Sequence, residues 1–272
     1  MKTAMQHCKS ILWSGVKQVS LSHQFFRMSS TCRVALLQIT ATSDKLENRK
    51  TCSGLLQKAK ESGAQVAFLP EAFDFIGESS AQTAELAEFV NKPNGTIDFY
   101  KSKAKELGLA LSLGGFHEKI GQDGKLANTH VFLDKDGNMI GKYSKAHLFD
   151  VEIPDRGVRL KESDYVQAGN VITEPVKLFG SFRVGLSICY DLRFPELSLS
   201  LRRRGANILT FPSAFTVPTG AAGHWSALLK ARAIENQCYV IAAAQSGRHN
   251  SKRSSYGHAC IIGINNNNSN IS

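Results

Sequence analysis

The stretch VGLSICYDLRFPE, residues 184–196, starts as an apolar run, reaches Cys189 and passes directly into charged residues. The apolar run predicts a buried strand, and Pro195 favours the first turn of a helix just beyond it. A strand, a sharp turn and a helix start in this order present one side chain at the rim of a sheet. We therefore expect Cys189 to face a substrate, with a pKa lowered by the helix N-terminus and a nearby cation. By itself, however, one cysteine after an apolar run is more often a buried structural residue.

The rest of the chain alternates short apolar runs with amphipathic helical stretches, which predicts an α/β layered fold. Strands are expected at 33–39, 64–70, 109–116, 183–188, 206–213, 238–245 and 254–264, and helices at 43–63, 81–107 with a break at 92–95, 194–205 and 222–237. Residues 127–145 hold the turn sequence DKDG between two strand-like runs and predict a hairpin. Residues 150–182 are rich in charge and loop formers, so we expect a long functional loop there.

The composition is that of a chain with a substantial core, since 42% of its 272 residues are hydrophobic. Charged residues interrupt every apolar run before it reaches the roughly 18 residues of a membrane span. Four of the ten net positive charges fall in residues 1–31, and the remainder forms no long basic stripe. We therefore expect neither a membrane nor a nucleic-acid partner. The six cysteines show no CxxC pairs or metal-ligand spacing, which predicts free thiols, a reducing compartment and no metal site.

The two ends of the chain differ from the middle. Residues 1–31 are basic, contain serine and lack acidic residues, which predicts a mitochondrial transit peptide, with a disordered tail as the alternative. Met28 follows Arg27 and could serve as an internal start, which would give a second, cytoplasmic form. Residues 265–272 are Asn-rich and predict a disordered tail.

Two further charged residues stand where predicted strands end. Glu71 follows the run AFLP, and Lys145 follows the second strand of the predicted hairpin. Because ligand sites of parallel α/β sheets lie beyond the carboxyl ends of the strands, we expect both to meet Cys189. A carboxylate can take the proton of a thiol, and an ammonium can stabilise the oxyanion that forms on an attacked carbonyl. For each charge alone, a surface ion pair or a capping role is the alternative.

Three motifs carry a resemblance to a known family: FLPEAFDF around Glu71, KAHLFDVEIP from Lys145 and GLSICYDLRFPEL around Cys189. In this order they resemble the nitrilase, or carbon-nitrogen hydrolase, superfamily, and the similarity extends over about residues 33–262 and is greatest to its Nit branch. The resemblance implies a four-layer α-β-β-α sandwich of the nitrilase type, in a carbon-nitrogen hydrolase domain over residues 32–264. Relatives continue past SYGHA with further strands, so it also implies a sandwich truncated at the C-terminus.

The resemblance implies a role for each residue of the site. Glu71 is the general base, Lys145 the oxyanion stabiliser and Cys189 the nucleophile, with the backbone amide of Tyr190 as a second oxyanion donor. Glu162 falls where the family carries a supporting carboxylate that orients the lysine. Neither a metal nor an organic cofactor is implied.

Two other residues match substrate-pocket positions of the family. Arg193, four residues after the cysteine, is expected to hold a carboxylate of the substrate. Phe215 in PSAFT would line the same pocket. The alternatives are that Arg193 pairs only with Asp191 or Glu196, and that Phe215 belongs to the core.

The resemblance also implies the reaction and the partners. The substrate is a small amide, closest to deaminated glutathione, which is hydrolysed through a thioester to 2-oxoglutarate and cysteinylglycine. The alternatives are an ω-amidase acting on 2-oxoglutaramate-like amides, a cysteine hydrolase with His147 as its base, and an impaired truncated form that acts only as an interaction protein. The family implies a homo-oligomer, and the leader predicts mitochondrial and cytoplasmic localisation.

Overall fold

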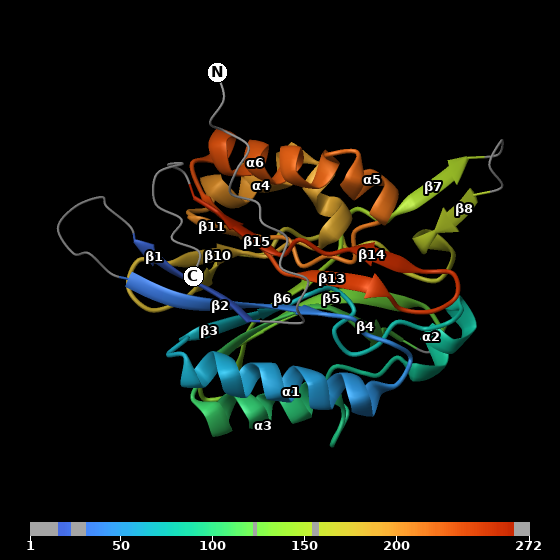
Figure 1. Ribbon diagram of the computed structural model, residues 1–272, viewed down its shortest axis with the longest axis horizontal. Coiled ribbons are helices and arrows are strands. Elements are labelled where there is room, and N and C mark those ends of the chain that lie inside the picture. Colours follow the sequence, from blue (N-terminus) through green and yellow to red (C-terminus); the bar gives the residue numbers. More distant parts are fainter. Residues whose placement is uncertain (1–15, 23–30, 122–123, 154–157, 264–272) are drawn as a thin grey trace.

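The computed structural model describes residues 16–22, 31–121, 124–153 and 158–263. Two β-sheets lie face to face, and helices cover the outer face of each (Figure 1). This arrangement is a four-layer α-β-β-α sandwich, so the predicted fold class is confirmed.

The first sheet has eight described strands in the order β14-β13-β2-β3-β4-β5-β6, with β1 paired to β2. Neighbours β13, β2, β3 and β4 run parallel, whereas β4, β5 and β6 are antiparallel. The carboxyl ends of the parallel strands therefore lie at one edge, where the sequence predicts the site. The bounds are β1 Val16–Ser22, β2 Thr31–Ile39, β3 Val66–Leu69, β4 Ala110–Lys119, β5 Leu126–Leu133, β6 Met139–Ser144, β13 Ala244–Arg248 and β14 Ser254–Tyr256.

The second sheet has five described strands in the order β15-β12-β11-β10-β9. Its central strands β10, β11 and β12 are parallel. A separate antiparallel hairpin, β7 with β8, projects from one end of the sandwich (Figure 1). The bounds are β7 Asp150–Ile153, β8 Val158–Lys161, β9 Val176–Lys177, β10 Arg183–Gly185, β11 Ile208–Thr210, β12 Tyr239–Ala242 and β15 Cys260–Ile262.

Helices α1 and α3 cover the first sheet, and α4 and α6 cover the second (Figure 1). The side chain of Asp44 caps α1 by accepting hydrogen bonds from the amides of Leu46 and Glu47. Pro195 occupies the first turn of α4, as the sequence predicts. No helix in the described part of the chain is long and apolar enough to cross a membrane. The bounds are α1 Lys45–Glu61, α2 Ser80–Leu86, α3 Thr96–Leu107, α4 Pro195–Arg203, α5 Val217–Ala221 and α6 His224–Asn236.

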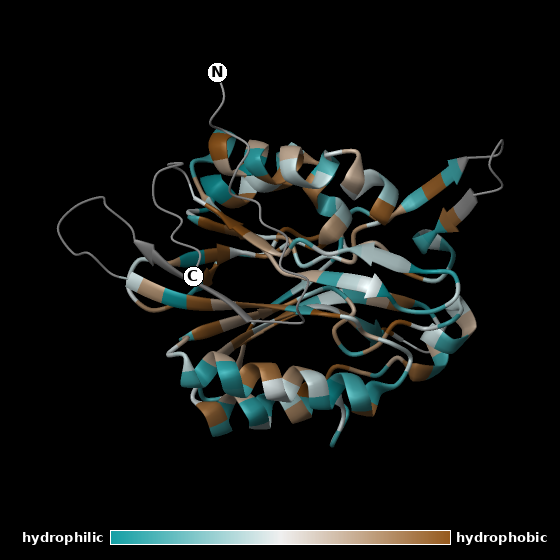
Figure 2. Cartoon of the chain, in the orientation of Figure 1, coloured by the Kyte–Doolittle hydropathy of each residue, from teal (hydrophilic) through white to brown (hydrophobic). Residues whose placement is uncertain are grey.

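Strand β2 shows how the layers are held together. Val34 and Leu36 belong to the core shared by the two sheets. Ala35 and Leu37 belong to the second core, under α1 and α3. Because side chains alternate between the faces of a strand, one continuous apolar run serves both cores. Figure 2 shows the same arrangement, with hydrophobic strands between helices that carry hydrophilic residues on their outer faces.

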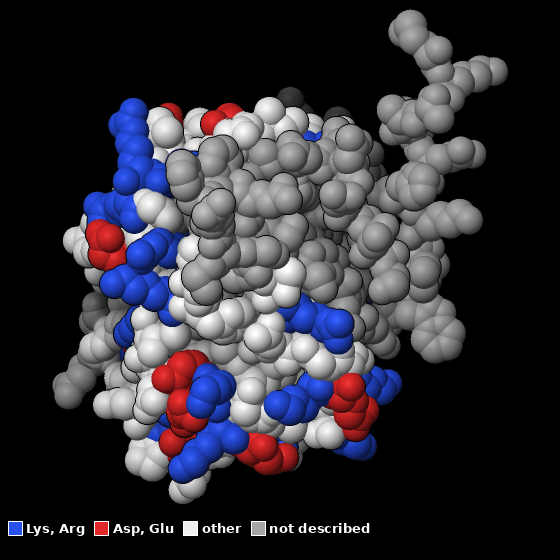
Figure 3. Space-filling view, turned by 90° about the vertical axis from the view of Figure 1, so that its left-hand side faces the viewer, with Lys and Arg blue, Asp and Glu red and all other residues white. Residues whose placement is uncertain are grey.

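The charged surface mixes both signs. On the face shown in Figure 3, Lys and Arg side chains lie beside Asp and Glu side chains. Ion pairs of this kind join Lys103 to Glu106 and Arg204 to Glu174, each with 2.7 Å between nitrogen and oxygen. Part of the positive charge is therefore matched locally by acids.

The structure differs from the predicted elements in several places. The long loop expected at 150–182 contains β7, β8 and β9. The strands expected at 238–245 and 254–264 are each divided, since β12 and β15 belong to the second sheet and β13 and β14 to the first. The helix expected at 81–107 is interrupted from 87 to 95, beyond the expected break at 92–95. The leader is described only at its residues 16–22, which form β1, while Met28 and the tail 265–272 lie outside the described residues.

Candidate active site

Cys189 lies beyond the end of β10, at the first position of a 3₁₀ helix, Cys189–Arg193. Its φ of 45° is in the left-handed region, which is uncommon for a residue with a side chain and is typical of functional turns. The backbone amide of Cys189 donates to the carbonyl of Pro212 at 3.0 Å, which ties the turn to the segment after β11. The cysteine is 9% exposed, so the expected sharp turn is present but the thiol faces the protein interior.

Glu71 follows β3 and is buried beside this turn. Its Oε1 accepts hydrogen bonds from Asn128 Nδ2 at 2.9 Å and Lys145 Nζ at 3.1 Å. Its Oε2 accepts from the backbone amide of Ala214 at 2.9 Å. The thiol of Cys189 lies close enough to this carboxylate for the charge of Glu71 to raise the pKa of the thiol. The structure therefore brings the predicted acid and the predicted thiol close together.

Lys145 follows β6 and is 2% exposed. Its ammonium lies between two carboxylates, 3.1 Å from Glu71 Oε1 and 2.8 Å from Glu162 Oε2. Glu162 also accepts from the backbone amide of Phe149 at 2.7 Å, which fixes its Oε2. All four residues predicted for the centre of the site thus form one cluster.

Burial and the neighbouring charges set the protonation of this cluster. Burial and the negative charge of Glu71 raise the pKa of the Cys189 thiol, and together they outweigh the opposite effect of Lys145. The prediction of a lowered thiol pKa is therefore wrong. Burial alone would raise the pKa of Glu71, but Lys145 and the hydrogen bonds to the carboxylate lower it to about 2. Burial alone would lower the pKa of Lys145, but Glu162 and Glu71 hold it well above its usual value.

The outer residues of the predicted site lie around Cys189. Tyr190 is the next residue of the turn, and the guanidinium of Arg193 lies 5.8 Å from the centre of its ring. The same guanidinium lies 5.9 Å from the ring of Phe215 and 3.2 Å from His224 Nδ1. Phe215 is buried against Trp225, with 5.0 Å between ring centroids. Arg193 and Phe215 are thus near each other, and no ion pair from Arg193 to Asp191 or Glu196 is found within the described residues.

Asn128 belongs to the centre of the site and was missed by the sequence analysis. Its Nδ2 donates to Glu71 Oε1 at 2.9 Å and to Glu162 Oε1 at 3.1 Å. The signal was the hairpin register, because Thr129 pairs with Ser144 and the next pair outward joins Asn128 to Lys145.

The sequence analysis considered Asp191 only as a partner of Arg193, yet its side chain holds the turn at Cys189 through hydrogen bonds. Its buried carboxylate accepts from Tyr143 Oη at 2.9 Å, from the amide of Ile188 at 2.8 Å and from the amide of His147 at 3.1 Å. His147 Nδ1 lies 2.7 Å from the same carboxylate, and its ring stacks on Phe194 with 3.7 Å between centroids. His147 is therefore held by Asp191 and is not placed against the cysteine by any described contact.

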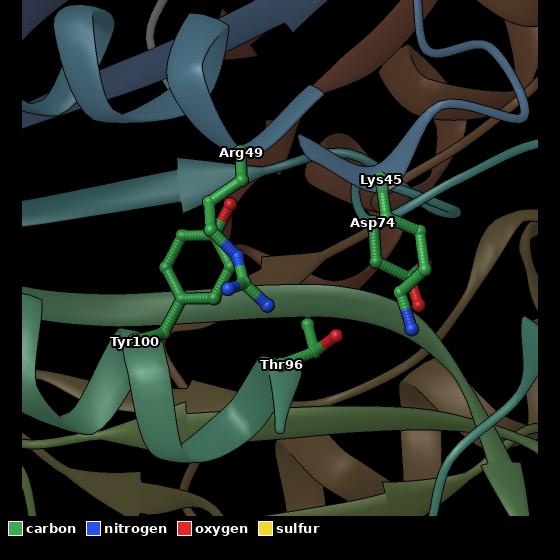
Figure 4. Close-up of a pocket in the computed structure, with 5 residues that line it drawn as sticks. All are labelled: Lys45, Arg49, Asp74, Thr96 and Tyr100. Carbon is green, nitrogen blue, oxygen red and sulfur yellow. The ribbon is translucent and has the colours of Figure 1, made fainter. Parts of the chain in front are cut away.

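A second polar pocket lies between α1 and α3 and is lined by Lys45, Arg49, Asp74, Thr96 and Tyr100 (Figure 4). Neither oxygen of the Asp74 carboxylate has a hydrogen-bond partner in the described chain. Its Oδ1 lies 3.5 Å from His117 Nδ1. None of the residues predicted for the site lines this pocket, so the chemistry-bearing cluster is the one at Cys189.

The α-β-β-α sandwich places a thiol, two carboxylates and an ammonium at its strand ends. This is the architecture of a thiol hydrolase, as the three sequence motifs imply. The chain belongs to the carbon-nitrogen hydrolase family, whose model matches residues 33–266. It is a hydrolase that acts on carbon–nitrogen bonds of amides. The resemblance drawn from the motifs is therefore confirmed.

Individual relatives agree with this assignment. The chain is 52% identical to deaminated glutathione amidase of Mus musculus over 233 residues, which cover 84% of this chain and 70% of the relative. The crystal structure of the Caenorhabditis elegans NitFhit protein matches with a TM-score of 0.79 and 43% identity, over 92% of this chain and 57% of that one. Nit3 of Saccharomyces cerevisiae, a member of branch 10 of the nitrilase superfamily, matches with a TM-score of 0.75 and 28% identity, over 86% and 82% of the two chains.

Proposed function

We propose that this amidase hydrolyses deaminated glutathione to 2-oxoglutarate and cysteinylglycine, with Glu71 as general base, Lys145 as oxyanion stabiliser and Cys189 as nucleophile. The observation that carries the proposal is the clustering of the three groups, with Glu71 Oε1 3.1 Å from Lys145 Nζ and the charge of Glu71 close enough to raise the pKa of the Cys189 thiol. The substrate is the one named for the relative at 52% identity.

In the first half of the reaction, Glu71 takes the proton of the Cys189 thiol as the sulfur attacks the amide carbon. The raised thiol pKa means that the resting residue is protonated, so the base acts at the moment of attack. The amide oxygen becomes an oxyanion, which Lys145 and the backbone amide of Tyr190 stabilise. The Tyr190 amide donates no hydrogen bond to a described residue, which leaves it free for this role.

In the second half, the proton held by Glu71 passes to the leaving nitrogen, the carbon–nitrogen bond breaks and cysteinylglycine departs. The 2-oxoglutaryl group remains on Cys189 as a thioester. Glu71 then removes a proton from water, whose oxygen attacks the thioester carbon. Collapse of this intermediate releases 2-oxoglutarate, and the proton returns to the sulfur.

Two further residues have supporting roles in this proposal. Glu162 keeps Lys145 charged and directed at the oxyanion, since its Oε2 lies 2.8 Å from the ammonium. Arg193 binds the carboxylate at the α-keto acid end of the substrate, because a guanidinium pairs with a carboxylate through two parallel hydrogen bonds. Its position beside Phe215 places this charge next to an apolar wall.

The test is turnover of deaminated glutathione by the purified chain, measured as release of 2-oxoglutarate and cysteinylglycine. We expect turnover by the wild-type chain and none by Cys189→Ala. A mass increase matching a 2-oxoglutaryl thioester should appear on Cys189 in the wild-type chain when the reaction is quenched with acid soon after substrate is added. Unchanged hydrolysis in Cys189→Ala would overturn the mechanism.

The alternatives give different results in the same assay. A higher kcat/KM for 2-oxoglutaramate than for deaminated glutathione would make the chain an ω-amidase with the same cluster. Absence of turnover with both amides, in a chain that melts cooperatively, would favour a protein that acts only through interactions.

A further inference from the structure

We infer that Asn128 is a positioning residue that selects which oxygen of Glu71 receives the proton of the Cys189 thiol. The inference rests on the proposed role of Glu71 as the base. Asn128 touches neither sulfur nor substrate in this scheme and acts through the two carboxylates and the lysine.

The selection follows from counting acceptor positions. Each oxygen of an ionised carboxylate offers about two lone pairs. Glu71 Oε1 already accepts from Asn128 at 2.9 Å and from Lys145 at 3.1 Å, so both of its positions are filled. Oε2 accepts only from the amide of Ala214, at 2.9 Å, among the other described donors. We therefore assign the thiol to the free position on Oε2. Removing Asn128 would leave a free position on each oxygen, so either could take the proton.

The orientation of the Asn128 amide is determined by its surroundings. Its Nδ2 donates to both Glu71 and Glu162, and a flipped amide would place its oxygen against two carboxylates. In the observed orientation, Oδ1 is buried and has no hydrogen-bond partner within the described residues. A buried acceptor without a partner costs free energy, so the two hydrogen bonds donated by Nδ2 must offset this cost.

The backbone of Asn128 holds the third member of the cluster. Its carbonyl accepts from the amide of Lys145 at 2.8 Å, which closes the end of the β5–β6 ladder. One residue on β5 thus fixes the backbone of Lys145 and both of the carboxylates that flank the ammonium. This geometry keeps the two carboxylates and the ammonium in a single arrangement before the substrate binds.

The experiment compares Asn128→Ala with the isosteric Asn128→Asp. Both lose the two amide donors, and we expect kcat to fall by about 10 to 100-fold with KM within about threefold of wild type, as for other residues that orient reacting groups. The aspartate variant fills the same space but places an acceptor against two carboxylates, so a role in packing alone predicts an activity ratio of the two variants that does not change with pH. When protonated, an aspartic acid regains one O–H donor, so the ratio of Asn128→Asp to Asn128→Ala activity should rise as the pH falls from 8 to 6.

A matched control is Asn207, a buried residue whose side chain joins Arg183 and Ser181 in the second sheet, away from the acids. Asn207→Asp and Asn207→Ala should show no rise in their activity ratio over the same pH range. Thermal melts of all four variants separate loss of folding from loss of positioning. Wild-type kcat in Asn128→Ala, or a flat ratio for the Asn128 pair, would overturn the inference.

Alkylation of Cys189 by iodoacetamide keeps this result distinct from the proposed function. Removing donors to an anionic cluster raises the proton affinity of its members, so alkylation in Asn128→Ala should shift to higher pH. A shift in a chain that turns over neither amide would remove the proposed function and keep the positioning role. Full amide turnover by Asn128→Ala, with no shift of its alkylation profile and no loss of kcat, would keep the proposed function and remove the positioning role.

Discussion

The carboxylate of Glu71 accepts a hydrogen bond of 2.9 Å from the backbone amide of Ala214, although the two residues belong to different sheets. Glu71 follows β3 in the first sheet, and Ala214 follows β11 in the second. Gln245 of β13 links the same two segments, since its side chain donates to the carbonyls of Glu71 and Ala72, each at 3.0 Å, and its backbone amide donates to the carbonyl of Ser213 at 2.8 Å. The cluster of Glu71, Lys145 and Cys189 is therefore complete only when the two sheets are packed, so its geometry depends on the whole sandwich.

Replacing Glu71 by Gln should lower the pKa of Cys189 while removing activity. Burial remains in the variant, but the negative charge that raises the thiol pKa is gone and Lys145 stays close. Hydrolysis should fall by about 100 to 10,000-fold, the usual contribution of a general base. Thiolate absorbance or alkylation rate against pH measures the first effect, and turnover measures the second. A thiol pKa that stays constant or rises would show that Glu71 does not control the thiol.

Replacing His147 by Ala should leave most of the activity. Its Nδ1 contacts Asp191 at 2.7 Å and its ring stacks on Phe194, so its contacts are those of a structural residue. We expect kcat/KM within about tenfold of wild type and a loss of about 1–3 kcal/mol in the free energy of unfolding, from the weakened partnership with a buried carboxylate. Steady-state kinetics and urea unfolding check this. A loss as large as that of Glu71→Gln would instead support His147 as the base.

Replacing Gly115 by Ala should displace Glu71. A Cβ at this position would lie 2.7 Å from Glu71 Cγ and 2.8 Å from its Cα, closer than real contacts allow. The φ of +64° adds backbone strain, but Gly124→Ala is a control for that effect because Gly124 has a φ of +78° and open space around it. We expect Gly115→Ala to lose at least about tenfold more activity than Gly124→Ala. Equal activity of the two variants in the amide assay would show that the space between Gly115 and Glu71 tolerates a methyl group.

Much of the architecture could be predicted from the sequence because strand and helix periods were clear. The apolar run 33–39 became β2, and Pro195 began α4. The division of 238–245 between β12 and β13 could not be predicted, since a continuous apolar run does not show which sheet each half joins. The short strands within 150–182 were missed because half of their residues are charged and their pairing is set by tertiary contacts.

The centre of the site was accessible to prediction because Glu71, Lys145 and Cys189 each follow a strand-like run and lie in motifs of the family. The direction of the thiol pKa was not, because it depends on burial and on the position of Glu71, which only the folded chain defines. Asn128 was missed for a related reason. The hairpin register places it opposite Lys145, but Asn128 is the first of three consecutive polar residues of β5, and the sequence does not show which of them meets the two carboxylates.

Replacing Glu88 by Gln should remove acid-sensitive stability. Glu88 Oε2 accepts from the amide of Thr96 at 2.8 Å, at the start of α3, and Oε1 contacts Lys45 and Lys92 at 2.9 and 3.0 Å. Burial alone would raise the pKa of Glu88, but these donors lower it from 4.5 to about 2. A carboxylate whose pKa is lower in the folded than in the unfolded chain stabilises the fold at pH values above its unfolded pKa. This stabilisation is lost as the pH falls from about 4.5 towards 2.

At pH 7 we expect Glu88→Gln to lose about 1–2 kcal/mol of unfolding free energy, at the low end for hydrogen bonds to a charged group because the site is partly open to water. The exposed Glu85 on α2 provides the control, and Glu85→Gln should change stability by less than about 0.5 kcal/mol. Urea unfolding at pH 7, 4.5 and 3 measures all three chains. Glu71 titrates in the same acid range in each chain, so only the difference between wild type and Glu88→Gln is informative. That difference should shrink as the pH falls, and a constant difference would show that the carboxylate charge of Glu88 does not hold α1 to α3.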